Sequence, residues 1–246
     1  MSFNLIKNGF NVLFATVTFL TTFYTMAHFT FFLSNPNYFT PNETHIQDDL
    51  FTIIRNLFID TILISTFILQ HSLMAHKSFK EFLLKYKIES LQRCIYVLAT
   101  SISVQLLLVF WKIIPSVSLW SYKFNNDPIW WIYLIVHTFG WMLIYVCSIL
   151  MDIGELLGFK QVYYGINNLG DPFNHKSQRL QKLYRHMRHP GFLILIIIFW
   201  GVPVMSLDRI LLSTMLSLYM YIAFRTDVSD YEYQRQQYLR KIDHLR

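Results

Sequence analysis

Two histidines and an arginine stand directly before the last apolar block of the chain, in the stretch HMRHP at 186–190. Pro190 suits the first turn of a helix, because that turn needs no N–H from it and accepts its fixed φ. His186, Arg188 and His189 would then lie at a helix N-terminus, where free backbone N–H groups and the helix dipole favour an anion. The stretch predicts a site for a carboxylate or phosphate ligand. No third ligand stands at helical spacing with the two histidines, so no metal site is predicted.

Other titratable side chains stand at the ends of apolar segments elsewhere in the chain. His71 lies near the end of one segment, Asp152 and Glu155 follow another, and Asp227 and Asp230 follow the last. Polar groups at membrane depth are costly and tend to face the bundle interior or a hydrated cavity. These residues are therefore further pocket candidates, although two acids three residues apart at a helix end are also typical of a solvated surface.

The composition indicates which elements must position these residues. Hydrophobic residues make up 54% of the 246 positions and charged residues only 15%, which is too apolar for an ordinary soluble domain of this size. A helix needs about 20 mainly apolar residues to cross a bilayer. Four segments reach that length, and Val202-Pro203 with the polar residues after it divides a fifth block into two short pieces. The sequence predicts an all-α membrane helix bundle in one domain, residues 1–246, ending in a short helical hairpin. The six predicted transmembrane helices are about 9–33, 51–75, 91–114, 129–151, 191–207 and 209–226.

The distribution of basic residues predicts how this bundle is oriented. Six spans place both termini on one side, together with the connections 76–93 and 152–190. Of the 21 Lys and Arg residues, 17 fall on that side, here called the basic face, because the opposite side keeps only Arg55, Lys112, Lys123 and Arg209. The excess predicts a cytosolic or nucleoplasmic basic face, to which all the candidate residues above are then brought.

The net charge of +6 favours one class of partner over another. The basic residues are scattered over several loops and are not gathered on one recognition element. This pattern favours contact with the anionic headgroups of the lipid bilayer, and no direct reading of nucleic acid is expected.

Two titratable residues lie deep in predicted spans, far from the basic face. Asp60 and His137 are each about nine residues from the opposite end of their spans, or about 13 Å deep by helical rise. A lone carboxylate at that depth would be costly. We therefore expect Asp60 and His137 to pair with each other.

Several longer stretches resemble a known family. They are QHSLMA at 70–75, LQRCIYV at 91–97, ELLGFKQVYY at 155–164, and HMRHP at 186–190 followed by VPVMSLDRILL. Together they resemble the nurim family, in unbroken order from about residue 51 to 241. The resemblance implies a six-helix multi-pass protein of the nuclear inner membrane, with both termini nucleoplasmic or cytosolic. It also implies a part similar to isoprenylcysteine carboxyl methyltransferases over residues 183–241.

The methyltransferase likeness implies a set of cofactor-binding residues. Those enzymes carry a Gly-x-Tyr-x-x-x-Arg-His-Pro-x-Tyr-x-Gly pattern that helps to hold S-adenosylmethionine. Lys182 and Ile194 stand at its two glycine positions, where a side chain could fill the space in which backbone would approach the cofactor. The residues implied to contact the cofactor are Tyr184, Arg188, His189, Pro190 and Phe192, with Asp227 or Asp230 in place of the family's paired glutamates.

The sequence leaves three functions open. The first is a structural or interaction protein of the inner nuclear membrane, with nuclear-envelope proteins as partners and a methyltransferase-like fold of lost or altered activity. The second is a working S-adenosylmethionine-dependent methyltransferase, whose lipophilic prenyl, thiol or lipid substrate would reach the site sideways from the bilayer. The third is haem or metal binding through His71, His186 and His189. Intact Tyr184 and Arg188 favour the second function, and the lost glycines favour the first.

Overall fold

The structure is a computed structural model, and helices make up almost all of its regular elements. Its helices are α1 (Ser2–Ser34), α2 (Leu50–Ala75), α3 (Lys77–Lys85), η2 (Glu89–Leu91), α4 (Gln92–Phe110), α5 (Pro128–Leu150), α6 (Ile153–Leu156), α7 (Phe159–Ile166), η3 (Pro172–His175), α9 (Phe192–Trp200) and α10 (Leu207–Ala223), and its strands are β1 (Ser118–Ser121) and β2 (Val204–Ser206). The residues that the structure describes are 2–35, 49–86, 88–122, 128–178, 180–181, 191–223, 231–232, 235–236, 238–240 and 242.

Four helices in the described part of the chain are long and apolar enough to cross a membrane. They are Asn4–Ser34, Leu50–Ala75, Glu89–Phe110 and Pro128–Leu150. These bounds confirm the first four predicted spans, except that the third helix ends at Phe110 and not near residue 114. Because α1 is rich in threonine, its side chains also need partners in an apolar surrounding. Several threonine hydroxyls donate a hydrogen bond to the carbonyl four residues earlier, as Thr18 does to Phe14 at 2.9 Å. These bonds keep the helix compatible with a membrane.

The last apolar block forms the predicted helical hairpin. Helix α9 ends at Trp200, the chain turns through Gly201 and Pro203, and α10 begins at Leu207. Strand β2 lies between these two helices and pairs antiparallel with β1, which lies in the connection between α4 and α5. This strand pairing was not predicted from the sequence. The described part of α9 is nine residues long, shorter than a span requires. The total of six transmembrane helices therefore stays a prediction.

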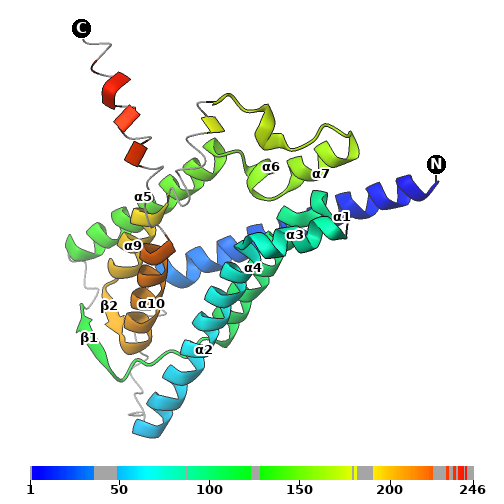
Figure 1. Cartoon of the computed structure of the whole chain (residues 1–246). Coiled ribbons are helices and arrows are strands. Elements are labelled where there is room, and N and C mark those ends of the chain that lie inside the picture. The colour runs from blue at the N-terminus through cyan, green and yellow to red at the C-terminus, as the bar shows by residue number, and fades with distance from the viewer. Residues whose placement is uncertain are drawn as a thin grey trace.

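One hydrophobic core joins helices α1, α2, α4, α5, α9 and α10. Helices α1 and α2 both pack along α4, α10 packs against α2, and α9 packs against both α5 and α10 (Figure 1). Gly140 lets α5 approach α9, since a Cβ there would lie 3.2 Å from the Ile198 side chain. The buried residues of this core are Phe32, Leu33, Ile64, Leu107, Leu108, Trp111, Trp141, Ile198, Phe199, Leu212 and Leu216.

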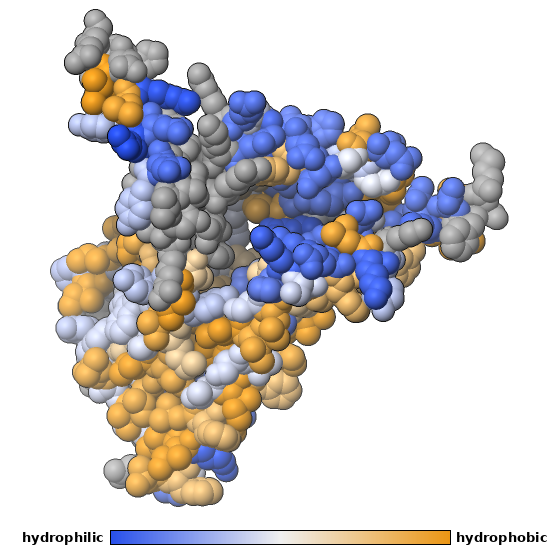
Figure 2. Space-filling model, in the orientation of Figure 1, coloured by the Kyte–Doolittle hydropathy of each residue, from blue (hydrophilic) through white to orange (hydrophobic). Residues whose placement is uncertain are grey.

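The surface divides into an apolar and a hydrophilic region. Figure 2 shows apolar side chains over the lower part of the molecule, where the long helices lie, and hydrophilic side chains gathered over α3, α6 and α7. This division matches a bundle whose long helices face lipid and whose short helices lie at the water interface. The short helices α6, α7 and η3 fall within the predicted connection at 152–190 on the basic face.

Candidate functional site: a polar cap on the basic face

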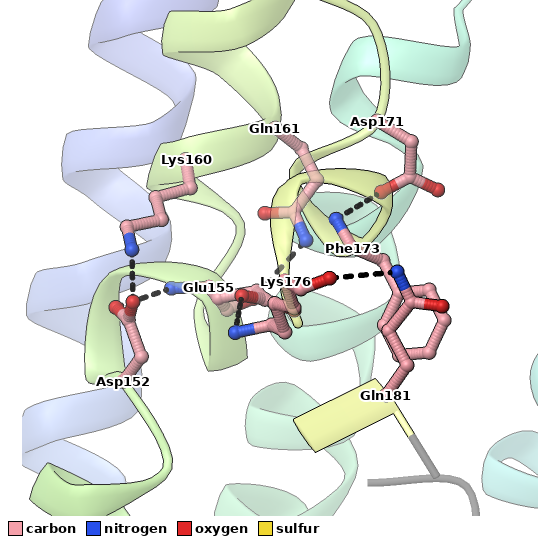
Figure 3. Close-up of polar contacts among 8 residues, drawn as sticks. All are labelled: Asp152, Glu155, Lys160, Gln161, Asp171, Phe173, Lys176 and Gln181. Atoms are coloured by element: carbon pink, nitrogen blue, oxygen red, sulfur yellow. Dashed lines mark hydrogen bonds and ion pairs between the residues drawn. The ribbon is translucent and has the colours of Figure 1, made fainter. Parts of the chain in front are cut away.

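The candidate site is built on a short helical unit that follows α5, here called the polar cap and comprising residues 152–178. It begins at Asp152, whose φ of 65° lies in the left-handed region, which an aspartate tolerates better than most residues. The Asp152 side chain accepts a hydrogen bond from the Glu155 N–H at 3.3 Å and so caps the N-terminus of α6. This turn directs the chain from the end of α5 into the cap (Figure 3).

Both predicted acidic residues are paired inside the polar cap (Figure 3). Asp152 forms an ion pair and hydrogen bond with Lys160, and Glu155 Oε2 lies 2.7 Å from Lys176 Nζ. The Glu155 and Lys176 side chains are only 13% and 11% exposed, so this ion pair is largely removed from solvent. Gln181 donates to the Lys176 carbonyl at 3.0 Å and extends the network. The two carboxylates therefore hold the cap together.

The electrostatics of the Asp152–Lys160 pair follow from this geometry. Partial burial acts to raise the pKa of the Asp152 carboxyl, but hydrogen bonds from Lys160 and the Glu155 N–H, with the nearby lysine charges, outweigh it. The pKa of Asp152 consequently lies below its ordinary value. The hydrogen bond to Asp152 raises the pKa of Lys160. Both groups are charged at neutral pH.

Two glycines and an arginine attach the polar cap to the start of α4. Arg93 Nε donates to the Leu156 carbonyl at 2.8 Å. Gly158 has a φ of +95°, and a Cβ there would lie 2.5 Å from Cys94 Sγ and 2.8 Å from Cys94 N. A Cβ at Gly165 would lie 2.7 Å from Ser90 Cβ. Only glycine permits so close an approach, so the cap packs directly against the start of α4.

A cavity of about 1080 Å³ lies beside this attachment. Its walls come from the first turns of α1, the end of α2, α3, the start of α4, α7 and the segment around η3. Three cations line it, namely Lys7, Lys80 and Arg93, together with two acids, Glu89 and Asp171. No pattern in the sequence predicted this cavity. Arg93 stands at the start of a span, and that position alone is typical of a simple membrane anchor.

His71, a predicted pocket candidate, is engaged with the helices around it. The Tyr96 hydroxyl lies 2.8 Å from His71 Nε2, and Thr100 Oγ1 lies 3.4 Å from Nδ1. The Tyr219 ring of α10 contacts the imidazole edge to face, with ring centroids 6.3 Å apart. His71 therefore joins α2, α4 and α10. One turn of α4 connects it with the polar cap, because the Arg93 guanidinium carbon lies 5.5 Å from the Tyr96 ring centroid.

Most of the residues predicted to hold a cofactor lie outside the described part of the chain. Phe192 is described, and it is the half-buried first residue of α9. The described residues contain no group of three or more His, Cys, Asp or Glu side chains that could hold a metal ion. The predicted site residues outside the described chain are Tyr184, His186, Arg188, His189, Pro190, Asp227 and Asp230.

The predicted pairing of Asp60 with His137 is wrong. Both side chains are buried as expected, but His137 Nδ1 lies 2.7 Å from Ser34 Oγ and Nε2 lies 3.1 Å from the Gly201 carbonyl. Asp60 Oδ1 instead accepts from the Lys112 N–H at 2.9 Å. Since both ring nitrogens of His137 already have partners, none is left for the carboxylate. The prediction failed because it ignored the Lys112 N–H, the Gly201 carbonyl and the Ser34 hydroxyl, which contact these two side chains instead.

Comparison with known proteins identifies the family. The chain is 37% identical over 239 residues to a nurim homolog from Drosophila pseudoobscura pseudoobscura, and the match covers 94% of both chains. The chain belongs to the nurim family. A nurim homolog from Drosophila melanogaster is 36% identical over 91% of both chains. Nurim from Xenopus laevis is 43% identical over 74% of this chain and 65% of its own.

These comparisons support part of what the resemblance implied. Membership of the nurim family and the four candidate spans describe a nurim-like membrane protein. No family model matches the chain, and no solved structure matches it significantly. The nuclear location, the methyltransferase likeness of residues 183–241 and the S-adenosylmethionine site stay predictions.

Proposed function

We propose that this chain is a multi-pass protein of the inner nuclear membrane whose polar cap is a rigid interaction platform for nuclear-envelope proteins. The observation that carries the proposal is the attachment of the cap to α4 through Arg93 and Gly158. A segment clamped in this way presents the same surface at all times, which lowers the entropic cost of binding a partner.

The residues of the polar cap favour interaction over chemistry. Asp152 and Glu155, the two acids predicted as pocket candidates in this unit, are paired with lysines of the same unit. The cap also exposes apolar side chains outside the candidate spans, with Tyr163 61% exposed and Leu169 47% exposed. Amphipathic tyrosine is enriched at protein interfaces.

Loosening the polar cap tests this proposal. Gly158→Ala forces a Cβ against Cys94 in a backbone conformation that alanine avoids. In cells expressing a fluorescent fusion, we expect the variant to stay in the membrane but to recover faster after photobleaching of the nuclear rim. Gly9→Ala is the matched control, because a Cβ at Gly9 meets nothing within 4 Å, and it should recover at the wild-type rate.

Two outcomes would contradict the interaction role. Limited proteolysis first establishes that Gly158→Ala loosens residues 152–178. If the loosened protein is held at the nuclear rim as firmly as the wild type, the cap is not the platform. If the wild-type fusion spreads through other membranes and never concentrates at the rim, the location is wrong.

A second candidate function is an S-adenosylmethionine-dependent methyltransferase acting on a lipophilic substrate. It is favoured by the match of Tyr184, Arg188, His189 and Pro190 to the methyltransferase pattern, directly before α9. At the start of that helix Phe192 supplies an aromatic ring that an adenine could stack against. Methyl transfer needs mainly the alignment of donor and acceptor, so no nucleophilic side chain is required.

Calorimetry with S-adenosylmethionine tests the methyltransferase candidate. If the site functions, the detergent-solubilised protein binds the cofactor, and Arg188→Ala and His189→Ala each abolish the heat of binding. Tyr163→Ala, a change at an exposed residue of the polar cap that is not among the predicted cofactor residues, should leave the binding unchanged. The absence of heat from the wild-type protein at millimolar cofactor would count against this function.

A further inference from the structure

The cavity beside the polar cap lies at the level where candidate spans leave the membrane. Its wall includes Lys7 near the start of the span Asn4–Ser34, Met74 near the end of Leu50–Ala75, and Arg93 near the start of Glu89–Phe110. Span ends lie at the boundary between the hydrocarbon and the headgroups of a bilayer. The cavity is therefore level with lipid phosphates on the basic face.

The charges in the cavity suit an anionic group of fixed geometry. Lys7, Lys80 and Arg93 come from three different elements, α1, α3 and α4, and point to one space. These three cations outnumber the two acids that line the cavity, Glu89 and Asp171. The Asp171 carboxylate also accepts a hydrogen bond from the Phe173 N–H at 2.9 Å. The site consequently carries a net positive charge, which attracts an anion.

Arg93 is preorganised for a phosphate. Its Nε is held by the Leu156 carbonyl and its guanidinium lies over the Tyr96 ring. Among the described residues, its terminal nitrogens have no hydrogen-bond partner. A guanidinium that is fixed in orientation and keeps free N–H groups can bind two phosphate oxygens at once.

The remaining wall of the cavity is amphiphilic. Gln92 and Gln161 offer amide groups to hydroxyls, whereas Met74 and Leu84 are apolar. Leu84 is 49% exposed, and α3, which carries it, also exposes Phe82 and three lysines. A short helix of this kind lies in the interface plane with its apolar side chains towards the acyl chains. An apolar surface therefore leads from the cavity to the bilayer.

We propose that this cavity binds the phosphate-bearing headgroup of an anionic phospholipid, whose acyl chains lie along the apolar surfaces of α2 and α3. A volume of about 1080 Å³ holds a whole sugar or inositol headgroup and not only a phosphate. Phe192 is the predicted cofactor residue that the structure describes, and it does not line the cavity. The lipid site depends neither on the interaction role nor on methyl transfer.

Native mass spectrometry tests the proposal. The full-length protein is released from phosphatidylcholine nanodiscs that contain phosphatidylinositol, and the lipids that it retains are counted. We expect one retained phosphatidylinositol per chain. The double variant Lys7→Gln/Lys80→Gln should weaken its binding about tenfold or more, since each lysine near a membrane surface contributes substantially to anionic lipid binding. The matched control is Lys77→Gln/Lys85→Gln, which removes the same charge from exposed positions of α3 that do not line the cavity.

The controls separate a built site from general attraction and a lipid from a soluble ligand. An equal loss of binding in both double variants would overturn the proposal, because it would show only the attraction of a basic surface. Glycerophosphoinositol has the same headgroup without acyl chains, and we expect it to bind far more weakly than the lipid. If it binds as tightly, the ligand is a soluble phosphate and the lipid assignment is wrong. The four lysines are exposed, so neither change should alter the thermal unfolding of the protein.

Discussion

The two ends of the bundle handle charged side chains in opposite ways. In the polar cap, Asp152 and Glu155 pair with lysines. At the far end, the carboxylates of Asp60 and Asp208 are at most 1% exposed and bind backbone N–H groups and an indole. Arg209 donates to the Phe32 carbonyl at 2.9 Å and lies over its ring. We call these far-end residues, with Ser34 and His137, the far-end network.

The difference follows from what each end has to hold in place. The Asp152–Lys160 pair stays partly exposed at the water interface, with side-chain exposures of 29% and 42%, so it needs little desolvation. Inside the bundle, a charged partner for each acid would have to lose its water as well, as Arg209, which is 2% exposed, already has. Backbone N–H groups are already present there and need partners when the chain leaves a helix. The far-end carboxylates therefore fix the segment after α4, whereas the ion pairs of the cap shape a surface.

Replacement of Asp208 should give the largest effect in the molecule. Its Oδ2 accepts from Trp111 Nε1 at 3.0 Å and its Oδ1 from the Ile114 N–H at 3.1 Å. Asp208→Ala loses two buried hydrogen bonds and leaves two buried donors without a partner, at a cost of about 3 kcal/mol or more. Thermal unfolding in detergent would measure this loss. Asp208→Asn keeps one strong acceptor and should lose clearly less, and equal stability of wild type and alanine variant would show that the network is not structural.

Asp60 and His137 should behave as independent residues within the same network. Alanine at either position removes buried hydrogen bonds and should destabilise the protein by about 1–3 kcal/mol. Because Asp60 bonds to Lys112 while His137 bonds to Ser34 and Gly201, the two costs should add within about 0.5 kcal/mol. A double-mutant cycle on unfolding free energies measures the coupling. A coupling well above that value would mean that the two side chains interact after all.

The long helices could be predicted from sequence, but the far-end network could not. A run of about 20 apolar residues is a local signal, so the spans were predicted within a few residues. The end of α4 has no local signal in the sequence, because the carboxylates that bind the N–H groups of Lys112 and Ile114 come from residues 52 and 94 positions away. The helix consequently ends at Phe110 although the apolar pattern continues.

Sequence predicted the acids of the candidate site but not their role. Asp152 and Glu155 were recognised as polar groups at the end of a span, and the structure shows them as parts of the polar cap. Lys176, the partner of Glu155, lies 21 positions after it, and no spacing rule connects the two. Gly158 was the available signal, since a glycine between two short helices often marks a close approach of backbone. The anion site predicted at His186 to Pro190 stays a prediction.

The smallest effect expected concerns the charge on Asp152, and it should appear only as a function of pH. The pKa of Asp152 lies below 3.8 and that of Lys160 above 10.5, for the reasons given above. The pair therefore contributes its full stability between these two values. The contribution is lost as the pH falls below 3.8 through the lowered pKa of Asp152, and again as it rises above 10.5 through the raised pKa of Lys160.

Asp152→Asn isolates this charge, because asparagine also caps helices and tolerates a positive φ. The pair is partly exposed, with side-chain exposures of 29% for Asp152 and 42% for Lys160, so the loss at neutral pH should be about 0.5 kcal/mol or less. Unfolding of the cap, measured by protease digestion, should differ slightly between wild type and variant at pH 7, and the difference should shrink as the pH falls below 3.8 through the lowered pKa of Asp152. A difference between wild type and Asp152→Asn that grew towards acid would mean that the carboxylate is held protonated, and then the two ends of the bundle would not differ as described.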